Sequence, residues 1–84
     1  MDMSKTRVAM ISIIVDANTN TDALNGLLSE AGEYIIGRMG IPYPARQVSL
    51  ISVAIDAPSD AISALTGKLG RLGGVTVKTA YSKL

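Results

Sequence analysis

With 84 residues, 48% of them apolar, the chain can build one hydrophobic core and is too short for two domains of ordinary size, so we expect a single domain over 1–84. Its net charge of +1 comes from 8 basic and 7 acidic residues without a Lys/Arg cluster, which argues against direct nucleic-acid binding. The absence of Cys and His excludes thiolate and imidazole ligands and the usual neutral-pH proton shuttle, so we expect neither a metal site nor an enzyme.

The first predicted element is a strand over 8–15, which is rich in β-branched residues and apolar on both faces. This run is much shorter than the ~20 apolar residues that cross a membrane, and no secretory cleavage site accompanies it. We therefore expect no membrane contact and a cytoplasmic protein. Small polar residues over 18–21 then predict the start of a helix that runs to about Ala31, with Gly32 as its C-terminal cap.

Two further strands are predicted in the middle of the chain. The segment 34–41 alternates apolar with small or charged residues. Pro42 and Pro44, which lack an amide donor, follow it, so we expect this strand to lie at an edge of the sheet. The run 48–55 resembles the first strand in its β-branched content, and we interpret it as the second central strand.

A second helix and a fourth strand complete the pattern. Pro58 suits the first turn of this helix, and apolar residues recur after it at three- and four-residue steps as far as Leu72. Gly73 and Gly74 separate the helix from an alternating strand over 75–81. The order β-α-β-β-α-β predicts an α+β fold of the ferredoxin-like type, a four-stranded antiparallel sheet with both helices on one face.

Period-two alternation assigns the two faces of the predicted sheet. The residues expected to face the helices are Ala9, Ile11, Ile13, Val15, Ile51, Val53 and Ile55. The residues expected on the opposite face are Val8, Met10, Ser12, Ile14, Val48, Leu50, Ser52 and Ala54, with Arg38 and Lys78 on the flanking strands. This opposite face is too apolar for contact with water, so we expect another copy of the chain to cover it, or alternatively a different protein or a further domain.

The edge strand carries the most unusual local pattern, in which Gly37 and Gly40 lie on either side of Arg38 and Met39. Glycines in a strand permit close approach of another backbone or of a ligand, and Arg38 can hold an anion. The simpler interpretation is that the glycines mark a bulge or close packing. Arg38 and Gly40 are therefore candidate ligand-binding residues. The alternative is that both have a purely structural role.

The first strand-to-helix turn supplies the other candidate ligand-binding residues, Asp16, Asn18 and Asn20. Asp16 and Asp56 both end a central strand just before a helix, where paired carboxylates can serve as acid and base or bind a hard cation. We favour the simpler interpretation that they are charges that stabilise the start of a helix. No metal ligand is assigned.

The segments 34–43, 49–53, 56–58 and 62–70 together resemble the family of iron-only hydrogenase system regulators, and the resemblance covers nearly the whole chain. The resemblance implies a ferredoxin-like fold of the kind shared by ACT domains and the C-terminal domain of the nickel-responsive repressor. It also implies assembly into dimers or tetramers and a role close to hydrogenase expression or maturation. It implies no catalytic residue and identifies no cofactor.

This chain departs from those relatives in three respects. The repressors bind nickel through His and Cys, which are absent here, so nickel sensing of that kind is excluded. ACT domains commonly have a glycine in the first strand-to-helix turn where an amino acid binds, whereas the turn 16–21 has none, which argues against an amino-acid effector. The repressor also carries a DNA-binding segment before its sensor domain, and only a short segment precedes the first strand here.

We therefore expect a small homo-oligomeric regulatory or ligand-sensing module, a dimer or a tetramer, that acts through a protein partner. Its effector is expected at a subunit interface near Arg38, Gly40 and the turn that holds Asp16, Asn18 and Asn20. The alternative is a purely structural assembly protein with no small-molecule ligand. A small hydrolase is disfavoured, because no loop near the N-terminus offers the preorganised donors that such chemistry needs.

Overall fold

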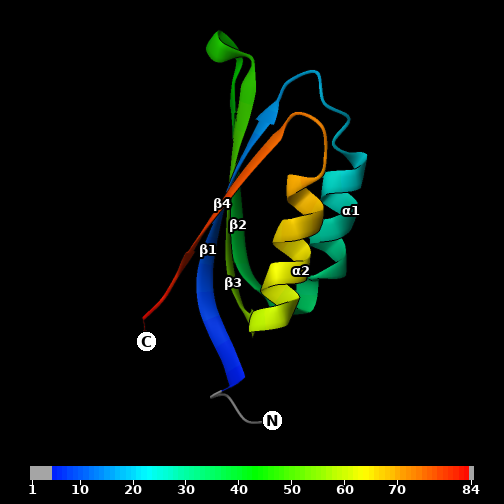
Figure 1. Cartoon of the computed structure of the whole chain (residues 1–84). Coiled ribbons are helices and arrows are strands. Elements are labelled where there is room, and N and C mark those ends of the chain that lie inside the picture. The colour runs from blue at the N-terminus through cyan, green and yellow to red at the C-terminus, as the bar shows by residue number, and fades with distance from the viewer. Residues whose placement is uncertain (1–4, 84) are drawn as a thin grey trace.

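The computed structural model describes residues 5–83 as one sheet with two helices on the same side of it (Figure 1). The strands are β1 (Thr6–Asp16), β2 (Ile35–Tyr43), β3 (Val48–Pro58) and β4 (Val75–Tyr81), the helices are α1 (Asp22–Glu30) and α2 (Ser59–Gly70), and two 3-10 turns, η2 (Gly32–Tyr34) and η3 (Pro44–Arg46), lie on either side of β2. The strand order is β2-β3-β1-β4, and every pairing is antiparallel. The predicted ferredoxin-like α+β fold is confirmed, with β2 at an edge.

Two of the predicted helix ends are wrong. Pro58 does not lie in the first turn of α2: it ends β3, with an extended ψ of 143°, because the strand continues past Asp56 and Ala57 before the helix begins. Gly32 is not the cap of α1. Ala31 holds that position and donates its backbone N–H to Leu27, after which η2 begins at Gly32.

The core forms between the inner face of the sheet and the two helices. Its buried apolar residues are Ala9, Ile11, Ile13, Val15, Leu24, Leu28, Val53, Ile55, Ala57, Ile62, Leu65 and Leu69. Alternate residues of β1 are buried, since successive side chains of a strand point to opposite faces. All seven residues predicted to face the helices belong to this core or, in the case of Ile51, pack against it.

A bulge in β2 changes the face on which its residues lie. Ile35 pairs with Ile55, but the next pairing joins Gly37 to Ala54, so Ile36 is an extra residue without an opposite partner. Beyond the bulge, Arg38 pairs with Val53, whose side chain is buried toward the helices. An inserted residue shifts the alternation by one position, so every side chain of β2 after Ile36 lies on the face opposite to the one that unbroken alternation predicts.

Candidate functional site

The first candidate surface is the sheet face away from the helices, here called the open sheet face. The pairing register assigns to it Val8, Met10, Ser12 and Ile14 of β1, Gly37, Met39, Ile41 and Tyr43 of β2, Val48, Leu50, Ser52 and Ala54 of β3, and Thr76, Lys78 and Ala80 of β4. Its seven large exposed side chains, Val8, Met10, Ile14, Met39, Ile41, Tyr43 and Leu50, keep 39% to 59% of their full exposure. The predicted apolar outer face is therefore present, and neither helix covers it (Figure 1).

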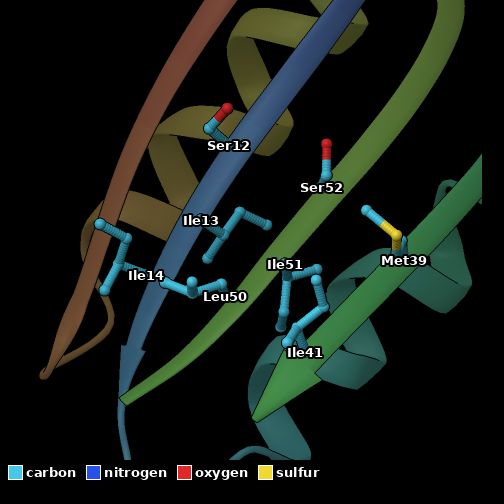
Figure 2. Close-up of a pocket in the computed structure, with 8 residues that line it drawn as sticks. All are labelled: Ser12, Ile13, Ile14, Met39, Ile41, Leu50, Ile51 and Ser52. Carbon is cyan, nitrogen blue, oxygen red and sulfur yellow. The ribbon is translucent and has the colours of Figure 1, made fainter. Parts of the chain in front are cut away.

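The open sheet face is hollowed around Ser12 and Ser52. Ser12 lies directly opposite Ser52, and Figure 2 shows these two small side chains near Met39, Ile14 and Leu50. A hollow of about 210 Å³ lies over this region. A second hollow of about 260 Å³ lies around Gly37 and also borders Met39. A surface with a protruding Met39 side chain and hollows beside it can interlock with another apolar surface.

Charge is sparse on the open sheet face. Lys78 lies beside Ser12 on β4, as predicted, and Asp56 lies at one end of the face opposite Val8. One carboxylate oxygen of Asp56, Oδ1, is buried without a hydrogen-bond partner. A buried acceptor that lacks a donor is costly, and this end of the face therefore has an unsatisfied polar group.

Arg38 does not lie on this face, and its predicted position is wrong. The bulge at Ile36 turns Arg38 toward the helices, where its Nη2 donates a hydrogen bond of 3.3 Å to Oδ1 of Asn25 on α1. Gly40 pairs with Ile51 and lies on the same side. The structure thus brings Arg38 and Gly40 together on the helix side of β2, and Arg38 also borders the hollow around Gly37.

The second candidate surface is a hollow of about 200 Å³ between α1 and β2, here called the α1–β2 groove. Its apolar wall and floor include Leu24 and Ile51, and its polar lining includes Thr21, Asn25 and Arg38. Sequence reasoning missed Thr21 and Asn25. Their spacing on the helix, four residues apart, is the signal that places both on one side of α1.

The three remaining predicted site residues do not line this groove. Oδ1 of Asp16 accepts a hydrogen bond of 2.9 Å from the backbone N–H of Asn18, and Oδ1 of Asn20 accepts one of 2.9 Å from the N–H of Asp22. The Asp16 side chain therefore stabilises the turn that follows β1, six residues before α1 begins, and the Asn20 side chain stabilises the start of α1. No hydrogen bond ties the Asn18 side chain to the part of the chain that the structure describes.

Within residues 5–83, no three His, Cys, Asp or Glu side chains gather as a group that could hold a metal ion. The same described residues contain no helix with the length and apolar character needed to cross a membrane. The candidate sites are therefore an apolar face and an amphipathic groove on opposite sides of one sheet.

Comparison with known proteins gives one family. The model of a family described as "TM1266-like: Iron-only hydrogenase system regulator, putative" matches residues 7–79. The solved structure of the uncharacterized protein TM1266 from Thermotoga maritima is 34% identical in sequence and superposes with a TM-score of 0.88 over 93% of this chain and 99% of that one. No curated protein matches the chain.

Two more distant structures share the fold alone. A formyltetrahydrofolate deformylase from Pseudomonas putida is 12% identical, with a TM-score of 0.59 over 87% of this chain and 28% of that one. LarC2, the C-terminal domain of a cyclometallase involved in the synthesis of the NPN cofactor of lactate racemase, is 13% identical, with a TM-score of 0.51 over 93% and 57%. Neither adds a residue to the two candidate sites.

Proposed function

The chain belongs to the TM1266-like family of iron-only hydrogenase system regulators, and we propose that it regulates this system by self-assembly and by binding a protein partner, without catalysing a reaction. The observation that carries the proposal is the open sheet face. Its seven large side chains together present on the order of 600 Å² of apolar surface, at the top of the range for the largest patch of a monomer. A face of this kind stabilises an assembly when a second surface covers it.

A second copy of the chain is the occupant that we propose for this face. The smaller residues around Ser12 and Ser52 add to the apolar area, so that the face approaches the roughly 800 Å² that each partner buries in a standard interface. The face has few charges that would oppose such burial, and closed two-fold assemblies use the same patch on both copies. The partner protein then binds the assembled module on a surface other than the open sheet face.

The mass of the purified chain by light scattering after size-exclusion chromatography tests the assembly. We expect a dimer or tetramer of the 8.8 kDa chain. Ile14→Lys and Met39→Lys each place a charge in the middle of the face and should give a folded monomer. Ser63→Lys, which places the same charge at an exposed position of α2, is the matched control and should leave the oligomeric state unchanged. A monomeric wild-type chain, or an oligomer that survives both substitutions, contradicts the proposal.

The regulatory role is tested in a cell that makes an iron-only hydrogenase. Replacing the gene with the Ile14→Lys variant should change hydrogenase activity or abundance as deletion of the gene does, whereas the Ser63→Lys variant should behave like the wild type. Hydrogenase activity and abundance that do not respond to the deletion would reject the regulatory role and leave the structural assembly protein as the alternative.

A further inference from the structure

We propose that the α1–β2 groove binds a small monocarboxylate with a short apolar tail. This goes beyond self-assembly, because the groove lies on the helix side of the sheet and the open sheet face lies on the other. The two surfaces share strand β2, whose side chains alternate between them. Ile41 and Ile51 line both the groove and the hollow over Ser12 and Ser52, so the two surfaces meet along β2 and a second copy on the sheet face can affect a ligand in the groove.

The polar end of the groove suits a carboxylate. Arg38 forms its hydrogen bond with the neutral Asn25, and no ion pair joins it to an acidic side chain of residues 5–83. A guanidinium has five N–H donors in a planar fork that matches the two oxygens of a carboxylate. Because Oδ1 of Asn25 accepts from Arg38, the amide nitrogen of Asn25 remains available as a donor. The hydroxyl of Thr21, one helical turn away, is a third donor in the lining.

The other end of the groove suits a compact apolar group. Leu24 and Val15 are buried beneath it, and Ile51 forms part of the floor. Gly40 faces this space, and a β-carbon added at position 40 would meet no atom within 4 Å. The glycine thus leaves room for a guest that a side chain would otherwise fill. The hollow of about 200 Å³ is open to solvent and has room for a branched chain or one small ring beside a carboxylate.

A carboxylate fits this site better than a phosphate does. One guanidinium and two neutral donors balance a single negative charge better than they balance two. The apolar walls add nothing for inorganic phosphate. The ligand class is therefore a monoanion with a hydrophobic body.

Two glycine substitutions in one strand provide the sharpest test. Gly40→Val fills the groove, whereas Gly37→Val makes the same change three residues earlier on the open sheet face. Both glycines have open space where a β-carbon would lie, and neither has a positive φ, so both variants should fold. Arg38→Gln removes the charge from the groove, and Arg46→Gln, in the exposed turn η3, is its control.

The experiment titrates the full-length chain with benzoate and isobutyrate, with the neutral amides of the same shape, and with inorganic phosphate, and follows the backbone and side-chain amide signals by NMR. We expect the two carboxylates to shift the signals of Asn25, Arg38 and Gly40, and the amides and phosphate to bind at least about tenfold more weakly. Gly40→Val and Arg38→Gln should each raise the dissociation constant for the carboxylates by about tenfold or more. Gly37→Val and Arg46→Gln should leave it unchanged.

Three results would overturn the proposal: no shifted signals at high concentrations of either carboxylate, equal affinity for carboxylate and amide, or equal weakening by Gly37→Val and Gly40→Val. A loss of assembly in Gly37→Val with normal carboxylate binding would leave this proposal intact and bear only on the sheet face. If the wild-type chain is monomeric and still binds the carboxylates, the proposed assembly is wrong and the proposed groove site stands.

Discussion

Gly74 lies so close to Thr19 that a β-carbon at position 74 would collide with the Thr19 hydroxyl oxygen. Gly74 has a φ of 77°, and its carbonyl accepts a hydrogen bond of 2.8 Å from the backbone N–H of Asp16. The Thr19 hydroxyl in turn donates to the carbonyl of Gly73 at 3.3 Å. These two hydrogen bonds thus join the turn after β1 to the turn before β4, at the end of the sheet where α1 begins.

We therefore expect Gly74→Ala to lower the free energy of unfolding by about 2–3 kcal/mol, through an unfavourable φ combined with a steric clash. Gly73→Ala is the matched control, because position 73 has open space and no positive φ, and its effect should stay within about 0.5 kcal/mol. Urea unfolding of both variants at one protein concentration measures the difference. Equal stability of the two variants would show that the contact at Gly74 is dispensable.

A second prediction separates a structural role from a ligand role for the β1–α1 turn. Asn20 accepts a hydrogen bond from the N–H of Asp22 at the start of α1, so Asn20→Ala should cost about 1 kcal/mol of stability, as the loss of a helix cap does. Asn18→Ala should cost less, since no such bond fixes the Asn18 side chain within the described residues. Neither change should weaken carboxylate binding in the α1–β2 groove. Denaturant unfolding measures the effect on stability, and the NMR titration measures the effect on carboxylate binding. A large loss of binding in Asn20→Ala would mean that this turn is part of the ligand site.

The alternation of β1 and β3 made the core predictable, because both strands run without interruption and their inner residues are almost all apolar. The position of Arg38 was not predictable in the same way. The glycines of β2 indicated a bulge, and one lies next to Gly37, but the sequence pattern does not say which residue is the extra one. That residue, Ile36, decides whether Arg38 lies on the sheet face or beside α1. Asn25 was missed because a polar residue on an exposed helix position gives no sign of its neighbour in a distant strand.

A third prediction compares the two faces of β1. Ile11 is fully buried in the core, and Met10 next to it is 44% exposed on the open sheet face. Ile11→Ala should lower the free energy of unfolding by about 2–5 kcal/mol, the usual cost of such a cavity. Met10→Ala should cost the isolated fold less than about 1 kcal/mol and should instead raise the dissociation constant of the oligomer. Unfolding curves recorded at several protein concentrations separate the two effects, and a concentration-independent loss in Met10→Ala would place this residue in the core of the monomer.

A fourth prediction concerns the interactions that would hold the proposed oligomer together. On the open sheet face Lys78 lies on the edge strand β4 beside Ser12, and charges are few, so we expect burial of apolar area and not ion pairing to supply the association energy of the proposed oligomer. Salt at about 1 M shortens the Debye length to roughly 3 Å and screens exposed ion pairs, while hydrophobic contacts persist. The oligomer should therefore keep its mass when the salt concentration is raised, and Lys78→Leu should strengthen it by removing a charge from the margin of the interface. Light scattering across a salt series tests both statements. Dissociation of the wild-type oligomer by salt, or its weakening by Lys78→Leu, would mean that Lys78 pairs with an acidic group of the second copy.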